Sequence, residues 1–169
     1  MAYEFDGIND YIVVQDHPLL DITGGVTVSL WLKPTAQTAD RKTVLEKSGP
    51  IGWARYGLWC GTTETATFGV QTASNPRVYC GFPLPVGEWT HLAGTYDQQY
   101  LRFYVNGRLV GQIWHTGPIS VSEEGLYIGG DAFYDMEFFT GVIDEVRIYD
   151  GPLTAEEILA LSRDGGGQR

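Results

Sequence analysis

Apolar and polar residues alternate along most of this chain with a period of two, which is typical of β-strands that bury one face. The clearest examples are residues 26–32, 101–105 and 142–149. Further segments of this kind lie near residues 3–6, 10–14, 43–47, 56–60, 66–72, 77–82, 89–96, 108–114 and 126–130. About a dozen short strands separated by turns predict an all-β fold, in which two antiparallel sheets form a jelly-roll sandwich.

Two local signals add detail to this prediction. Asn106-Gly107 lies between two alternating segments and predicts a hairpin, because both residues tolerate the positive φ that a two-residue turn requires. Near the C-terminus, Thr154 and Glu157 have the spacing of a capping box, and the apolar segment Ile158–Leu161 follows. The sequence therefore predicts one short C-terminal helix that packs on the sandwich.

The length and composition fit a single globular domain. The chain has 169 residues, of which 43% are hydrophobic, and a domain typically contains roughly 100–200 residues. We expect one domain over residues 1–163 and a flexible, glycine-rich tail over residues 164–169. The 22 glycines and 8 prolines exclude a helical bundle and a coiled coil.

The charge balance restricts the possible partners. Lys and Arg number 11 against 21 Asp and Glu, so the net charge is −10. No run of Lys or Arg provides the basic patch that nucleic acids and anionic membrane surfaces attract, so neither partner is expected. Neutral ligands, cationic ligands and Ca²⁺ suit an acidic surface better.

No targeting or membrane segment is recognisable. The start, Met1–Phe5, lacks a basic region followed by an apolar run, and the longest apolar runs are too short to span a bilayer. We therefore expect no membrane insertion. The initial Met1 and the glycine-rich tail are typical of a module taken from a larger protein.

Three segments, taken together, resemble a known family. They are Phe5–Val14, Trp89–Gly107 and Phe139–Tyr149, the last followed by the predicted helix. In this order they are similar to laminin G-like domains, the jelly-roll modules related to concanavalin A-like lectins and glucanases and to pentraxins. The resemblance implies two curved antiparallel sheets, often a structural calcium ion, an extracellular or cell-surface location, and glycans or other proteins as partners. It does not fix the ligand, because many functions share this fold.

Asp144 is the leading candidate for a calcium ligand. It shares one strand face with Val146 and Ile148, and a carboxylate on an apolar face needs a partner. The resemblance implies that the first and last strands are neighbours, which would bring Asp6 and the turn at residues 7–10 close to Asp144. Ca²⁺ takes 6–8 oxygen ligands, which carboxylates, amides and backbone carbonyls supply. The predicted ligands are Asp6, Asn9, Asp131 and Asp144.

A simpler interpretation of the same residues remains open. Asp6, Asn9 and Asp10 can stabilise a turn by bonding nearby backbone N–H groups, and Asp144 can accept hydrogen bonds from that turn without a metal. Asp131 follows Gly130 and is most simply a turn residue.

Strand alternation also predicts a ligand-binding surface in the middle of the chain. If the apolar residues of these strands point inward, the opposite face carries Trp59, Gln71, Arg77 and Tyr79. Aromatic rings can stack on sugars, and Arg or amide groups can bond their hydroxyls. The complete set of expected ligand contacts is Trp53, Tyr56, Trp59, Gln71, Arg77, Tyr79, Trp114 and Tyr134. Core packing is the alternative for any aromatic residue in a strand, and we favour it for Trp31, Trp89 and Tyr104.

The two cysteines are Cys60 and Cys80. A simple meander places one whole strand between them, which separates them by roughly 10 Å at the usual strand spacing. A disulfide needs Cα atoms within about 7 Å, so we predict two buried thiols without a disulfide. A secretory context is the argument for the opposite outcome.

Catalytic motifs are scarce in this sequence. His17, His91 and His115 are scattered, and His91 is expected to be a packing residue. There is no Gly-x-Ser-x-Gly nucleophile motif and no Glu-x-Asp-x-x-Glu array of the kind that related jelly-roll glucanases carry. We therefore predict a non-catalytic carbohydrate-binding module. The alternatives are a protein-interaction or adhesion domain of the same fold and a jelly-roll glycoside hydrolase or lyase.

Overall fold

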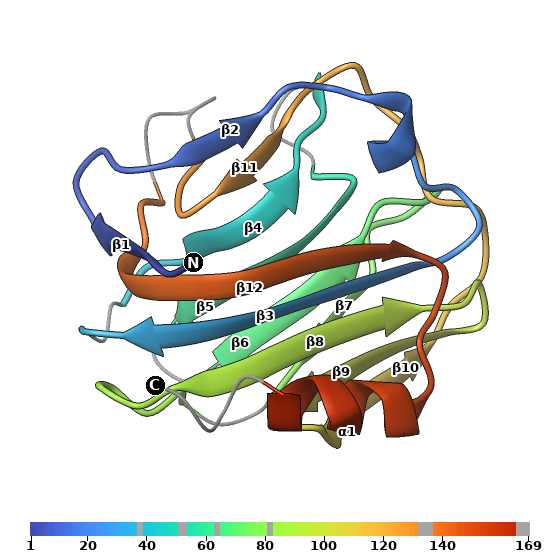
Figure 1. Cartoon of the computed structure of the whole chain (residues 1–169). Helices are drawn as coiled ribbons and strands as arrows, with labels where there is room; N and C mark the ends of the chain where they lie inside the picture. The colour runs from blue at the N-terminus through green and yellow to red at the C-terminus, as the bar shows by residue number, and fades with distance from the viewer. Residues whose placement is uncertain (37–38, 51–53, 63–64, 81–82, 132–136, 165–169) are drawn as a thin grey trace.

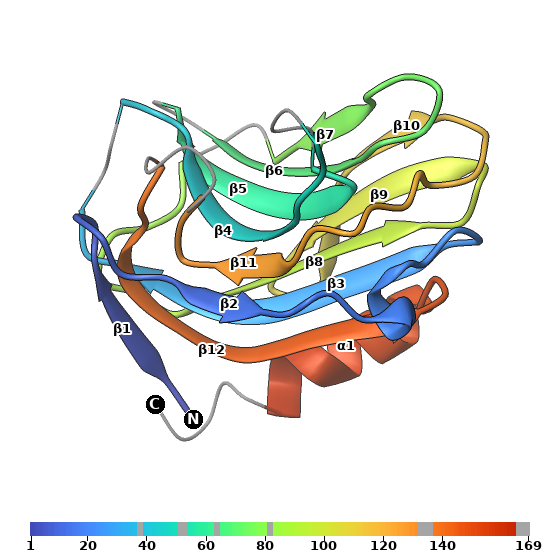
Figure 2. The same cartoon turned by 90° about the horizontal axis from the view of Figure 1, so that it is seen from above.

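Two six-stranded antiparallel sheets face each other in the computed structural model, which describes residues 1–36, 39–50, 54–62, 65–80, 83–131 and 137–164 (Figures 1 and 2). The first sheet contains, in spatial order, β1 (Tyr3–Asp6), β12 (Thr140–Asp150), β3 (Val26–Pro34), β8 (Thr90–Tyr96), β9 (Tyr100–Val105) and β10 (Arg108–Trp114). The second contains β2 (Ile12–Val14), β11 (Leu126–Ile128), β4 (Lys42–Lys47), β5 (Tyr56–Thr62), β6 (Thr65–Val70) and β7 (Arg77–Tyr79). The predicted all-β jelly-roll sandwich is confirmed.

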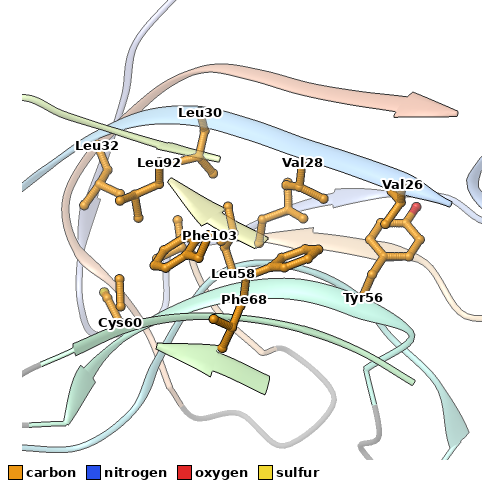
Figure 3. Packing of buried hydrophobic residues seen from close by; sticks show 14 of the residues in the cluster. Val26, Val28, Leu30, Leu32, Tyr56, Leu58, Cys60, Phe68, Leu92 and Phe103 are labelled. Carbon is orange, nitrogen blue, oxygen red and sulfur yellow. The ribbon is translucent and has the colours of Figure 1, made fainter. Parts of the chain in front are cut away.

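The core lies between the sheets and is built from alternate residues of the strands. Val28, Leu30 and Leu32 of β3 point toward the second sheet, and Leu58 and Phe68 point back toward the first (Figure 3). All five side chains are completely buried. This interdigitation of the two inner faces follows from the period-two pattern, since successive side chains of a strand leave on opposite sides.

Tyr56 belongs to this core, which corrects its expected place among the ligand contacts. Its side chain is only 1% exposed and points inward beside Val26 (Figure 3). Its hydroxyl donates to the carbonyl oxygen of Leu20 at 3.0 Å, so the one polar atom is also satisfied internally. The physical reason is strand parity: Tyr56 lies two residues before Leu58 and therefore shares its inward face.

The two cysteines are also core residues. Cys60 and Cys80 are buried thiols with no disulfide between them, which confirms the prediction. Strand β6 separates them, and the backbone N–H of Ala66 on β6 donates to Cys80 Sγ at 3.2 Å. Burial raises the pKa of the Cys60 thiol to about 12, so the thiol stays protonated at neutral pH.

The hairpin and the helix form where the sequence predicts them. Asn106 and Gly107 have φ values of 49° and 76° and join β9 to β10. Helix α1 (Ala155–Asp164) begins with the capping box: the Thr154 N–H donates to Glu157 Oε2 at 2.8 Å, and the Glu157 N–H donates to Thr154 Oγ1 at 3.3 Å. The structure adds a short 3₁₀ turn, Pro18–Leu20, which the sequence analysis did not predict.

Helix α1 covers part of the outer face of the first sheet. Ile158 is completely buried against Ala93 and Tyr104, and these residues form a second, smaller apolar cluster. Beside this cluster, His91 is only 1% exposed and packs edge-on against Trp31. Its Nε2 is hydrogen-bonded to Ser29 Oγ at 2.9 Å. The expected packing roles of Trp31 and Tyr104 are confirmed by their burial, at 7% and 4% exposed.

A buried lysine ties distant segments to the second sheet. Lys47 Nζ, at the end of β4, lies 2.5 Å from Asp16 Oδ1 and 3.7 Å from Asp21 Oδ1. It also donates to the carbonyl oxygens of Ser122, at 2.9 Å, and of Glu124. The ammonium group is completely buried and therefore needs these partners, because a buried charge without them is strongly unfavourable.

Candidate functional site

The outer face of the second sheet is the best candidate for a ligand-binding surface. Its strands β4 and β5 curve so that their concave side faces away from the first sheet (Figure 2). Gly57 and Gly69 lie directly opposite each other on β5 and β6. A Cβ atom at Gly57 would come within 2.8 Å of the Trp59 ring, and one at Gly69 within 3.4 Å. The two glycines therefore let the Trp59 indole lie flat across neighbouring strands.

Trp59 is held by contacts around its ring. Its Nε1–H donates to Glu46 Oε2 at 3.0 Å, from the neighbouring strand β4. The guanidinium carbon of Arg77 lies 4.4 Å from the ring centroid, and that of Arg41 lies 5.8 Å from it, both within cation–π range. These neighbours leave only 2% of Trp59 exposed. The indole thus supports the surface from below, and a sugar would reach its ring only after Arg77 moved.

The two arginines differ in how their charges are satisfied. Arg41 forms a double hydrogen bond with the Glu137 carboxylate, at 3.0 Å from Nε and 2.7 Å from Nη2, and Thr43 Oγ1 donates to the same carboxylate at 3.0 Å. Arg77 has no ion pair with any residue that the structure describes, and it is half-buried. Its pKa is lowered, first by burial and then by the nearby Arg41 cation. Arg77 therefore presents N–H donors for which the part of the chain that the structure describes shows no acceptor.

Glu46 is a functional candidate that the sequence analysis missed. Its side chain is 3% exposed, and Oε1 has no hydrogen-bond partner among the described residues. Burial, with the nearby Asp131 carboxylate as the second cause, raises the pKa of Glu46 to about 7. Alternation places Glu46 on the outer face, one residue after the core residue Leu45, but its burial and its bond to Trp59 come from the neighbouring strand, which a local pattern does not predict.

Two further predicted contacts lie on or beside this face. Tyr79 of β7 is opposite Thr67, which is opposite Trp59, so the register places Tyr79 on the same side of the sheet. Its ring is 53% exposed and accessible to a ligand. Gln71 follows β6, and its Nε2 donates to the carbonyl oxygens of Thr72 and Ser74 at 3.1 and 3.3 Å, so its amide holds a turn.

The remaining expected ligand contacts lie elsewhere. Trp114 is 69% exposed, but it ends β10 of the first sheet and is opposite Tyr100 rather than any residue of the Trp59 face. Trp53 and Tyr134 lie outside the described residues. The structure therefore brings together Trp59, Arg77 and Tyr79 from the expected set, and adds Glu46, Arg41 and Glu137.

Two of the predicted calcium ligands, Asp6 and Asp144, do not lie together. Strand β1 does pair with β12, as expected, but the register places Asp6 opposite Thr140. Asp144 lies four residues after Thr140 on β12, which separates the two positions by roughly 13 Å at the usual rise per residue of a strand. The predicted proximity of Asp6 and Asp144 is therefore wrong, because pairing of two strands does not fix which ends meet.

Each predicted calcium ligand already has another role or another place. Asp6 Oδ1 accepts from the backbone N–H groups of Ile8, at 2.8 Å, and Asn9, at 3.4 Å, which is the simpler turn interpretation. Asp144 accepts from the N-terminal ammonium group at 3.1 Å and from the Glu145 N–H at 2.7 Å. Asp131 is 3% exposed and interacts electrostatically with Glu46. Within the part of the chain that is described, no group of three or more His, Cys, Asp or Glu residues is arranged to hold a metal ion.

The fold is similar to several solved structures. Domain 4 of AbnA, an extracellular arabinanase from Geobacillus stearothermophilus, in complex with arabinotriose, aligns over 96% of this chain and 76% of its own, with a TM-score of 0.76 and 23% identity. The CBM40 of a Ruminococcus gnavus IT-sialidase, bound to α2,3-sialyllactose, aligns over 96% and 98%, with a TM-score of 0.73 and 13% identity. A heptameric pentraxin from Limulus polyphemus aligns over 99% and 84%, with a TM-score of 0.72 and 17% identity.

The sequence also matches a family model. The Laminin_G_3 model, described as the concanavalin A-like lectin/glucanases superfamily, matches residues 6–159. Among the described residues, no helix is long and apolar enough to cross a bilayer.

Proposed function

Because the chain belongs to the Laminin_G_3 family of concanavalin A-like lectins and glucanases, we propose that it is a non-catalytic carbohydrate-binding module that acts outside the cell. The observation that carries this proposal is the surface built around Trp59, with the Arg77 guanidinium stacked on the indole and the exposed Tyr79 ring beside it on the sheet. Similar folds support the ligand class, since two of them are described in complex with arabinotriose and with sialyllactose.

Two side chains, those of Tyr79 and Arg77, would contact the sugar in different ways. Tyr79 offers an exposed aromatic ring on which a sugar ring can stack, and Arg77 offers N–H donors, without an acceptor among the described residues, for sugar hydroxyl or carboxylate oxygens. Trp59 and Glu46 hold the surface in place from beneath. A site with the polar groups already oriented loses little conformational entropy when a ligand binds.

Burial of Glu46 supports a binding role over a catalytic one. Its pKa of about 7 would suit a general acid, but a side chain that is 3% exposed, with one oxygen bonded to Trp59, does not reach a glycosidic oxygen. We therefore expect no hydrolysis of any polysaccharide that the protein binds. Release of reducing ends from a bound polysaccharide would contradict this part of the proposal.

A glycan array followed by calorimetry with the best oligosaccharide tests the proposed surface. We expect Tyr79→Ala to weaken binding about three- to tenfold, the loss of one aromatic contact. Trp114→Ala removes a larger exposed aromatic side chain from the other sheet and is the matched control, for which we expect unchanged affinity. If Trp114→Ala weakens binding and Tyr79→Ala does not, the site lies at β10 instead. If no glycan on the array binds, the proposal fails and a protein-binding role is favoured.

A structural calcium ion is a separate part of the proposal and rests on the family resemblance alone. Since Asp6 and Asp144 lie apart, a single ion would not be bound by all four predicted ligands. Thermal unfolding in excess EDTA, followed by added Ca²⁺, tests it, because a ligand of the folded state raises stability by mass action. A melting temperature that falls and then recovers supports calcium. An unchanged melting temperature, with no metal found by elemental analysis, removes it.

A further inference from the structure

The candidate face carries two neighbouring arginines, Arg41 and Arg77, whose charges are compensated to different extents. Arg41 and Arg77 approach the same indole, but only Arg41 has a carboxylate partner, Glu137 at 2.7 Å. Among the described residues, no Asp or Glu lies within ion-pair distance of Arg77. Stacking on Trp59 fixes the position of the Arg77 guanidinium while its edge N–H groups remain available.

Burial and the Arg41 cation lower the pKa of Arg77, and Tyr79, Glu46 and Glu137 oppose this shift only in part. Arg77 is half-buried, and the strongest single charge acting on it is the Arg41 cation, which repels it. Glu137 is already bonded to Arg41 and to Thr43, so it only weakly compensates Arg77. Glu46 is partly protonated near neutral pH and directs one oxygen to the indole. An anion that bonded Arg77 would therefore supply an ion-pair partner that Arg77 does not have among the described residues.

We propose that Arg77 selects carboxylated glycans, binding the carboxylate of a uronic or sialic acid residue through paired N–H donors. This inference rests on the proposed function and names the ligand class of that same surface. The overall charge of −10 disfavours anions at long range, so recognition depends on the local guanidinium. Arginine suits this task because its planar fork matches the two oxygens of a carboxylate.

Two pairs of probes that differ only in charge test the proposal. Trigalacturonate is compared with its methyl ester, and α2,3-sialyllactose is compared with lactose, each by calorimetry. We expect at least one acid to bind about tenfold or more tightly than its neutral counterpart, as a charge-assisted pair of hydrogen bonds implies. Which pair shows the difference identifies the uronate or the sialate as the source of the carboxylate.

Variants assign the preference to Arg77. We expect Arg77→Gln to abolish the difference between acid and neutral probe, and Arg77→Lys to keep part of it, because lysine retains the charge without the fork. Arg102→Gln is the matched control: Arg102 also lies over an aromatic ring, 4.9 Å from the Tyr100 centroid, but in the first sheet and paired with Asp97. It changes the net charge equally and should leave the preference intact.

The outcomes separate this inference from the proposed function. The inference is overturned if neutral glycans bind as tightly as their acids and Arg77→Gln does not change the ratio of the two affinities. The carbohydrate-binding function would then still stand. A preference for acids that survives in Arg77→Gln also overturns it. If no acidic or neutral glycan binds, both proposals fail together.

Discussion

The outer faces of the two sheets each carry a tryptophan next to a buried titratable residue. On the first sheet, Trp31 packs edge-on against His91, with ring centroids 5.4 Å apart. On the second sheet, Trp59 donates to Glu46 at 3.0 Å. The first pair lies beside helix α1, whose Leu161 lines the same small pocket as His91. The second pair lies under the side chains of Arg41 and Arg77.

This difference teaches why similar residues have different roles. Beside the helix, Trp31 and His91 are both buried and His91 already bonds Ser29, so this pair offers little surface to a ligand. Under arginines, a Trp–Glu pair supports polar groups that still face solvent. Burial shifts both titratable groups toward their neutral forms, lowering the pKa of His91 to about 4 and raising that of Glu46 to about 7.

The largest expected effect comes from weakening the helix cover. Ile158→Ala removes the one completely buried side chain of α1, and we expect the free energy of unfolding to fall by about 2–4 kcal/mol in urea titrations. Glycan affinity should not change, because the helix lies on the other sheet. The exposed Glu156→Ala on the same helix is the control and should change stability by less than about 0.5 kcal/mol. A parallel loss of glycan binding would show that the two faces are coupled.

The next effect is the pH dependence of the first face. The folded-state pKa of His91 lies below its usual value of 6.5, so the unfolded chain binds more protons between pH 6.5 and pH 4. Stability from this group is therefore lost as the pH falls through that window, by about 3 kcal/mol at most. Urea titrations at pH 7.5 and 4.5 should show a smaller difference for His91→Gln than for the native protein. His17→Gln alters an exposed histidine and should leave the difference unchanged.

The second face should respond with the opposite sign. The pKa of Glu46 is raised from 4.5 to about 7, so the folded state binds more protons, and stability is lost as the pH rises through this window. Glu46→Gln removes the titration and keeps an acceptor for the Trp59 N–H. We expect this variant to gain about 3 kcal/mol at most relative to the native protein at pH 8 and little at pH 4. Glu88→Gln, an exposed control, should show neither effect, and equal stabilisation at both pH values would contradict the assignment.

The sequence contained enough information for the fold because its signals are local. Alternation located the strands, Asn106-Gly107 located a hairpin, and Thr154 with Glu157 located the start of the helix. Each of these signals depends on residues within a few positions of one another. The same parity placed Trp59, Arg77 and Tyr79 on one face, which the strand register confirms.

The predictions that failed or were not made depend on contacts between residues far apart in the sequence. The distance between Asp6 and Asp144 depends on the register of β1 on β12, and no short-range pattern encodes it. Glu46 was missed because its burial depends on neighbouring strands, and the second cause of its raised pKa, Asp131, is 85 positions later in the chain. Tyr56 is a different case, since its parity indicated the core and the choice of a ligand role overrode that signal.

The two buried thiols give this protein a natural reporter of its own motions. Cys60 and Cys80 flank β6 on the core side of the sheet that carries the candidate site, and neither is exposed by more than 9%. A thiol-specific reagent can react with them only when this part of the sandwich opens, so the labelling rate measures how often β6 separates from its neighbours. Ligand binding on the outer side of the same strands would slow that rate, which makes occupancy readable by mass spectrometry without any introduced label.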